Sequence, residues 1–214
     1  MAEPRIQYAK TADGVSIAFW TLGEGMPLVL MVDPAGSHVE KEWKVALLRG
    51  YYERLAEKSM VIRYDGRGLG MSEREVTDIS LDTMVADLAA VVDHLRLEKS
   101  ALFGTRFVGA AAVAYEAASP ERVSHLILQD AVVRGADFRE SGTGRAYRAL
   151  RDADWSTYVE NFGRLLPGVA ELIREAITPE TQKMVMDAAC SFRAASAVLR
   201  LLEKADRLGR AKKS

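Results

Sequence analysis

Few side chains in this sequence have the chemistry of a catalytic centre or a metal site. The 214 residues include three histidines, His38, His94 and His125, and one cysteine, Cys190. No two histidines have metal-ligand spacing, and a single cysteine can build neither a zinc site nor an intrachain disulfide. We therefore expect no metal and no cofactor. The cysteine content suits a reducing compartment, so a cytoplasmic location is expected.

A permanent cation, Arg106, lies in the segment GTRFVG at residues 104–109, directly after a short apolar run. A guanidinium stays protonated at any working pH, so it can hold an anion but cannot act as a nucleophile. Asp33 and Asp130 follow two other predicted strands and are expected at the same edge of the sheet. Two interpretations stay open, namely an internal ion pair with one of these acids or a site for an anionic ligand at the start of the next helix.

The elements that would position these side chains alternate between strand and helix. Residues 28–32 (LVLMV) are typical of a strand buried on both faces, and residues 81–96 carry apolar side chains at helical spacing. This alternation predicts an α/β fold, with a mostly parallel sheet of about six strands and flanking helices. The predicted strands are residues 5–9, 15–22, 28–32, 60–64, 100–103 and 123–128, and the predicted helices in this part are 39–57, 81–96 and 109–119.

After residue 144 the pattern indicates helices alone, over 144–166, 168–177 and 179–208. We expect residues 1–140 to form the sheet-based core and residues 141–214 a helical, lid-like segment that packs on this core. The aromatic side chains of this segment, among them Trp155 and Tyr158, are expected to pack as a helical layer on the sheet. A dedicated aromatic binding box is the less favoured alternative.

The most specific motif is YDGRGLGMS at residues 64–72, which matches the pattern D-x-R-G-x-G-x-S after a strand. Asp65, Arg67 and Ser72 would brace this turn by hydrogen bonds, and the glycines would allow its tight path. Together with SPERVSHLIL at residues 119–128, the turn resembles the α/β-hydrolase superfamily, and the resemblance covers residues 5–140. It implies an α/β-hydrolase-type sheet, a lid, and a strained turn after the fifth strand that lifts a serine nucleophile above the sheet.

The chain departs from the family pattern at that turn. Arg106 occupies the serine position, and Val108 occupies the position of the second glycine, which predicts a relaxed turn. The family order places the catalytic histidine late in the chain, whereas His125 is the last histidine here. Asp130 is then the surviving candidate for the acid, and His38 is a weak candidate for a base.

The resemblance also implies that Asp33, Ser37 and Phe107 line the pocket and the loop that would supply an oxyanion hole. Without a serine at the apex of the turn, we expect a non-catalytic α/β-hydrolase-like protein with a binding or regulatory role. Two alternatives stay open. One is a hydrolase of esters or similar small substrates with an atypical site, and the other is a truncated, decayed hydrolase.

Charge and strand order suggest the partners. The net charge of −1 gives no electrostatic basis for binding nucleic acid or a membrane surface, and no apolar run reaches membrane-spanning length. A small-molecule or anionic ligand is expected instead. If no further strand follows, residues 123–128 form a sheet edge without proline or lysine. Such an edge predicts a homo-oligomer or a protein partner.

Overall fold

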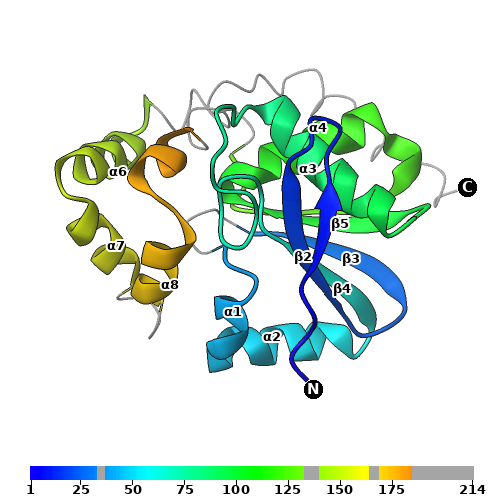
Figure 1. Ribbon diagram of the computed structural model, residues 1–214. Helices are drawn as coiled ribbons and strands as arrows, with labels where there is room; N and C mark the ends of the chain where they lie inside the picture. The colour runs from blue at the N-terminus through cyan, green and yellow to red at the C-terminus, as the bar shows by residue number, and fades with distance from the viewer. Residues whose placement is uncertain (33–36, 133–139, 164–168, 185–214) are drawn as a thin grey trace, which may run out of the picture.

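The computed structural model describes residues 1–32, 37–132, 140–163 and 169–184 and places six strands in one sheet (Figure 1). The strand order is β1-β2-β4-β3-β5-β6. The pairings of β3 with β4, β3 with β5 and β5 with β6 are parallel, whereas β1 with β2 and β2 with β4 are antiparallel. The prediction of an α/β sheet of about six strands is confirmed. The strands are Gln7–Lys10 (β1), Ser16–Leu22 (β2), Met26–Met31 (β3), Ser59–Tyr64 (β4), Ser100–Thr105 (β5) and Val123–Gln129 (β6).

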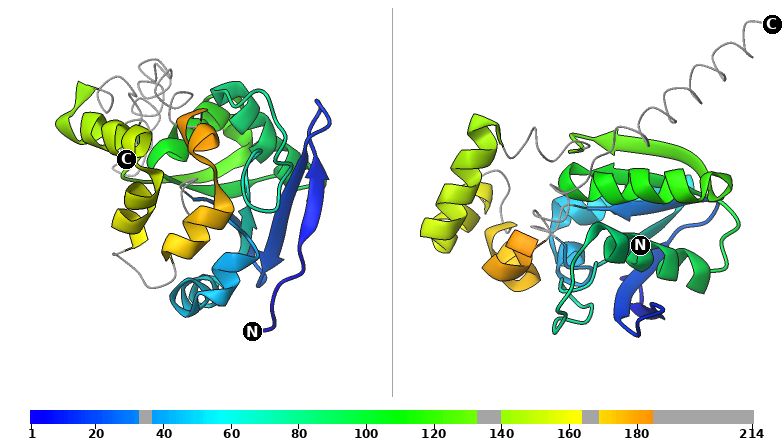
Figure 2. Two further views of the ribbon diagram at one scale, coloured as in Figure 1. Left: turned by 60° about the vertical axis from the view of Figure 1, so that its left-hand side comes forward. Right: turned by 90° about the horizontal axis from the view of Figure 1, so that it is seen from above.

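Helices cover both faces of the sheet, as the apolar strands require (Figures 1 and 2). Successive side chains of a strand point to opposite faces, and Val29 and Leu30 of β3 accordingly belong to different hydrophobic clusters. The cluster that contains Val29 is closed by Leu88 and its neighbours on one pair of helices. The cluster that contains Leu30 holds Trp43 from the other side. The helices are α3 (Leu81–His94) and α4 (Gly109–Ala118) on the first face, and α1 (Lys41–Lys44) and α2 (Ala46–Ala56) on the second.

The prediction of one continuous helix over residues 39–57 is wrong. Val45 has an extended backbone (φ −83°, ψ 108°) and separates α1 from α2. The break turns the single-turn α1 so that Glu42 and Trp43 are both buried. Helical periodicity in the sequence did not reveal this break or the burial of Glu42, which pairs with Arg63 far along the chain.

The helices after residue 140 are shorter than the sequence predicted. A single helix over 144–166 is wrong, because Asp154 interrupts it and caps the following helix by accepting the Thr157 N–H at 3.0 Å. The predicted helix over 179–208 is helical through residue 184, and its remainder lies outside the described residues. The boundary at residue 140 stays a prediction. The lid helices, as we call them, are α6 (Gly142–Ala153), α7 (Trp155–Gly163) and α8 (Val169–Ala176).

The aromatic side chains of the lid helices pack, but their neighbours differ from the prediction. Trp155 stacks on Tyr158 with ring centres 5.2 Å apart, and Tyr158 is buried. The cluster around them contains Ile173, Ile177 and Leu69. Leu69 comes from the turn after β4, so the described lid helices pack around this turn rather than on a face of the sheet.

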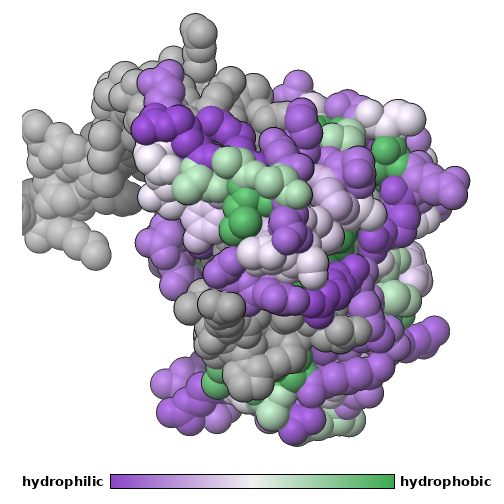
Figure 3. Space-filling view, turned by 90° about the vertical axis from the view of Figure 1, so that its left-hand side faces the viewer, coloured by the Kyte–Doolittle hydropathy of each residue, from purple (hydrophilic) through white to green (hydrophobic). Residues whose placement is uncertain are grey.

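The surface that carries the lid helices is largely hydrophilic over its described part (Figure 3). None of the helices in the described ranges is both long and apolar enough to cross a bilayer.

Candidate functional site

The turn between β5 and α4, which we call the apex turn (residues 104–109), carries Arg106. β5 ends at Thr105, residues Arg106–Val108 form one turn of 3-10 helix, and α4 begins at Gly109. Arg106 has a φ of 43°, in the left-handed region that residues with a side chain seldom adopt. The expectation of a relaxed turn is therefore wrong, and the strained geometry is present with an arginine at its apex.

Two glycines make this geometry possible. A Cβ atom on Gly104 would lie 3.0 Å from both the Cα of Gly109 and the Cβ of Ala112, and one on Gly109 would lie 2.5 Å from the Cβ of Ala131. β5 and α4 thus approach closely at Gly104, and α4 packs against the segment after β6 at Gly109, where a side chain would overlap Ala131. Gly109, directly after Val108, supplies the small residue that Val108 seemed to remove. The sequence therefore does contain a glycine for this turn, one position after the one that the family pattern specifies.

Arg106 lies beside Phe107 and contacts the segment after β6. Its side chain is half-buried, and its guanidinium carbon lies 5.9 Å from the centre of the buried Phe107 ring, within cation–π range. Its carbonyl oxygen accepts the Val132 N–H at 2.9 Å, which ties the apex turn to the segment after β6. Asp130 is exposed, has a φ of 50° and forms no ion pair within the described part of the chain. Asp33, the other predicted partner, lies outside the described residues.

Ser37 is tied into a network of buried charges. Its Oγ donates to Asp65 Oδ1 at 2.8 Å and accepts from Arg63 Nη2 at 2.9 Å, and its side chain is buried. The neighbouring His38 N–H donates to Glu42 Oε1 at 2.8 Å. Among the described residues no histidine contacts the Ser37 hydroxyl, so nothing there would activate it as a nucleophile. Its observed contacts are those of a residue that fixes the end of the loop.

Arg63 and Glu42 form a buried ion pair that the sequence analysis missed. Arg63 Nη2 lies 2.5 Å from Glu42 Oε1, and Arg63 Nε donates to Oε2 at 3.0 Å, with both side chains essentially inaccessible. The Tyr52 hydroxyl donates to the same carboxylate. Burial, and after it the charge of Glu42, raises the pKa of Tyr52 well above its usual value. The only sequence signal was a cation inside an otherwise apolar strand, MVIRY.

Arg67, from the motif, joins three segments of the chain. Its Nε and backbone N–H both donate to Asp87 of α3 at 2.9 Å, and its Nη1 donates to Asp13 of the β1–β2 turn at 2.7 Å. The hydrogen bond from Arg67 is the main reason that the pKa of Asp13 falls to about 2. Burial instead raises the pKa of Asp87. Arg67 therefore braces the turn, as its position in the motif suggested.

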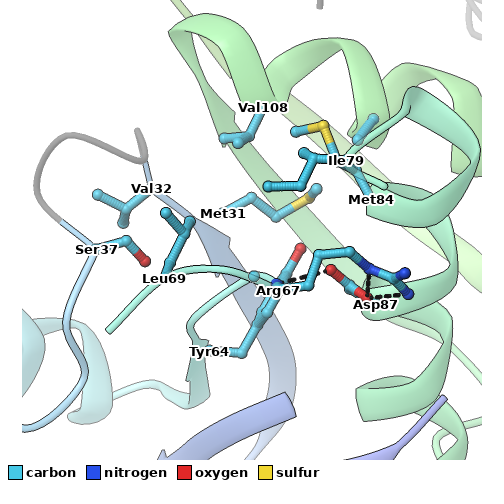
Figure 4. Close-up of a pocket in the computed structure, with 12 residues that line it drawn as sticks. Met31, Val32, Ser37, Tyr64, Arg67, Leu69, Ile79, Met84, Asp87 and Val108 are labelled. Atoms are coloured by element: carbon cyan, nitrogen blue, oxygen red, sulfur yellow. Dashed lines mark hydrogen bonds and ion pairs between the residues drawn. The ribbon is translucent and has the colours of Figure 1, made fainter. Parts of the chain in front are cut away.

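A small cavity of about 30 Å³ lies beneath the apex turn (Figure 4). This volume holds one or two water molecules and is too small for a substrate. Its walls bring together the loop around Ser37, the turn after β4, α3 and the apex turn, so it marks where these four segments meet. The residues that line it include Val32, Ser37, Arg67, Leu69, Asp87 and Val108.

The three histidines lie apart from one another. His38 is buried, and its Nδ1 accepts the Lys41 N–H at 3.4 Å. His94, at the end of α3, packs edge-on against Phe19, and His125 is exposed on β6. The described residues contain no group of histidine, cysteine or carboxylate side chains that could hold a metal ion. Ser37 and His38 are neighbours in the sequence, but the described side chains do not form a pair of nucleophile and base.

Comparison with known proteins finds relatives among hydrolases. A soluble epoxide hydrolase from a Corynebacterium species is 32% identical over 120 residues, which cover 56% of this chain and 40% of that protein. A 2-hydroxy-6-oxo-2,4-heptadienoate hydrolase from Pseudomonas putida is 31% identical over 124 residues, which cover 56% of this chain and 43% of that protein. This chain therefore spans about two-fifths of the length of these relatives. No family model matches it.

Solved structures share the arrangement more broadly than the sequence. A hydrolase from Pseudomonas aeruginosa superposes with a TM-score of 0.71 at 18% identity and covers 92% of this chain and 76% of its own. An esterase from Exiguobacterium antarcticum superposes with a TM-score of 0.70 at 23% identity and covers 86% of this chain and 73% of its own. At such low identities the likeness concerns the fold.

The ion pair between Asp13 and Arg67 predicts a loss of stability in acid. A carboxylate with a lowered folded-state pKa stabilises the fold above its unfolded pKa, and this contribution is lost as pH falls. For Asp13 the loss should occur between about pH 4 and the folded-state pKa of about 2. The exposed side chain limits the effect to about 0.5 kcal/mol. Urea unfolding of Asp13→Asn and the unmodified protein should differ at pH 6 and converge near pH 2; a constant difference would contradict the assignment. The raised pKa of Asp87 changes the stability with pH in the opposite direction, and it does so in both proteins.

The close packing at the apex turn predicts that Gly109→Ala destabilises the fold by about 1–3 kcal/mol, since the new methyl group would overlap Ala131. Gly50→Ala is the matched control, because Gly50 lies inside α2 with nothing within 4 Å of an added Cβ. The control should stabilise the protein by about 0.5–1 kcal/mol through its helix propensity. Urea unfolding of both variants checks the pair. Equal effects in the two variants would show that α4 and the segment after β6 are not in close contact at Gly109.

Proposed function

Because the chain has the α/β-hydrolase fold, we propose that it is a non-catalytic member of that superfamily that binds a small anionic ligand at the apex turn. The observation that carries the proposal is the left-handed φ of 43° at Arg106. A side chain held in this region costs free energy, and such strain persists chiefly at functional sites. The turn therefore keeps the geometry that presents a side chain above the sheet, with a cation as the side chain presented.

The chemistry of the position favours an anion. A guanidinium offers a planar set of donors that matches a carboxylate or phosphate. Arg106 begins the 3-10 turn that leads into α4, a helix of ten residues whose first N–H groups and dipole also favour negative charge at this end. In open α/β sheets ligands bind beyond the carboxyl ends of the strands, where the apex turn lies. These arguments hold whether or not an acidic side chain also forms an ion pair with the Arg106 guanidinium.

Hydrolysis is the competing activity, because the relatives named above are hydrolases. The described contacts offer it little support. The Ser37 hydroxyl is engaged by Asp65 and Arg63, and His38 accepts a backbone N–H through Nδ1. Asp130 is exposed at the end of β6. A hydrolase would therefore need a nucleophile and a base from residues other than these.

We expect Arg106→Gln to weaken binding of a probe anion such as benzoate or inorganic phosphate at least about tenfold, the loss of one charged hydrogen-bonded contact. Isothermal titration calorimetry measures the affinity. Arg54→Gln is the control, since Arg54 is also an arginine but is 80% exposed on α2, and it should bind as the unmodified protein does. No variant should hydrolyse p-nitrophenyl acetate above the buffer rate.

Three outcomes would contradict the proposal. Absence of anion binding by the unmodified protein would remove its basis. Unchanged affinity together with a lowered melting temperature in Arg106→Gln would favour an internal ion pair as the role of Arg106. Turnover of the ester would establish an enzyme with an atypical site.

We further propose that two copies of the chain associate through β6. This strand is last in the sheet order and pairs only with β5 within the described residues. Its sequence VSHLILQ contains no lysine, arginine, aspartate, glutamate or proline, and Ile127 and Leu128 are 46% and 39% exposed. Edges that avoid pairing usually carry such charges or prolines. An uncharged strand can instead pair with its own copy without repulsion between like charges.

Size-exclusion chromatography with light scattering should give a dimer mass at micromolar concentration. Ile127→Lys should shift the protein to a monomer, because it places a charge on the pairing strand. Leu47→Lys is the matched control on α2, where Leu47 is 60% exposed, and it should stay dimeric. A monomeric unmodified protein would exclude this association.

A further inference from the structure

Within the described residues the lid helices contact the core through the turn after β4, and Glu175 of α8 also pairs with Lys41 of α1. We call residues 65–74 the motif turn. Leu69 from this turn is buried among Tyr158 and Val159 of α7, Ile173 of α8 and Ile177, the residue after α8. A Cβ on Gly68 would lie 3.1 Å from the Thr181 side chain, so the turn also touches the segment after α8. In Figure 1 the turn lies between α8 and the sheet.

The carboxyl end of α8 is fastened to the same turn. The last carbonyl groups of a helix lack partners inside the helix, and a cation near them is favourable. Arg74 Nη1 donates to the carbonyl oxygens of Glu175 and Ala176 at 3.2 and 3.0 Å. The Gly70 N–H donates to the Ala176 carbonyl at 3.0 Å. The Glu175 side chain also pairs with Lys41 of α1 at 2.5 Å.

The other side of the motif turn holds the loop end at Ser37–Val39. The buried Asp65 carboxylate accepts from the Ser37 hydroxyl at 2.8 Å and from the Val39 and Met71 N–H groups at 3.1 and 2.9 Å. Gly70 has a φ of 44°, and a Cβ there would overlap the Asp65 carboxylate and lie 2.9 Å from His38 Cα. The backbone of Gly70 thus touches the loop end while its N–H holds α8.

We propose that the motif turn is a latch that couples the position of the lid helices to the conformation of the loop end Ser37–Val39. Gly70 and Asp65 are the coupling residues, because the backbone of one and the carboxylate of the other contact both the turn and the loop. The contacts with α8 are the ones that open. Arg74 is exposed, and the side chains of Lys41 and Glu175 are 36% and 35% exposed, so water competes for them.

Release of α8 should therefore loosen the loop end as well. The buried contacts of Asp65 have no water to replace them, so they respond only when Gly70 and Met71 shift. A displacement of the turn removes the Met71 N–H from Asp65 and changes the space available to His38. The proposal does not depend on anion binding by Arg106, and it concerns residues that the structure describes on both sides of the turn.

Hydrogen–deuterium exchange of the full chain tests the coupling. Arg74→Ala should speed amide exchange at least fivefold both in α8 and in residues 37–44, while α3 keeps its rate as an internal reference. Glu175→Ala, which removes the ion pair from the lid side, should act in the same direction. Arg54→Ala removes a comparable exposed pair with Glu57 at 3.0 Å on α2 and should change none of these segments.

The reciprocal experiment removes a contact on the loop side. Ser37→Ala should speed exchange in α8, because coupling between two sites acts equally in both directions. Faster exchange of α8 in Arg74→Ala with residues 37–44 unchanged would overturn the proposal. An equal increase in α8, residues 37–44 and α3 would overturn it as well, since it would indicate loss of global stability.

Discussion

A buried carboxylate directly after β4 is the constraint around which the segments at this edge of the sheet are arranged. Asp65 is inaccessible to water, and an isolated charge in such a place would be prohibitively costly. Donors reach it from the loop end through Ser37 and Val39 and from its own turn through Met71. Each of these segments must therefore hold its place for the carboxylate to stay paired. The left-handed conformation of Gly70 accompanies this arrangement, since a side chain there would overlap the Asp65 carboxylate.

The second buried charge pair acts on the same loop from the opposite direction. Glu42 receives the His38 N–H, and Arg63 donates to the Ser37 hydroxyl, so two consecutive residues of the loop are held by charges of opposite sign. A pair as deeply buried as Arg63 and Glu42 adds little net stability on average, because desolvation offsets the attraction. Its clearest effect here is geometric. It joins α1 to β4, from Glu42 to Arg63.

Much of the core followed from patterns that are local in the sequence. Alternation of apolar runs with amphipathic segments predicted the strands and α3, and the spacing of YDGRGLGMS identified the bracing role of Arg67. What could not be predicted depends on contacts between distant residues. The pairing of Glu42 with Arg63 and the close approach of Gly109 to Ala131 both join segments that are distant in the sequence. The geometry at Arg106 was predicted wrongly because Val108 was weighed alone, whereas the close approach depends on Gly104 and Gly109 together.

The position of β3 has a consequence for how the chain folds. This strand lies between β4 and β5, and its residue Leu28 pairs with Val61 on one side and Ala101 on the other. The chain between β3 and β4 and the longer chain between β3 and β5 must both close before these pairings can form. Closing such long segments is slow. The hairpin of β1 and β2 needs only the turn near Gly14 and can form at once. The middle of the sheet is therefore the part whose pairings depend most on contacts between distant segments.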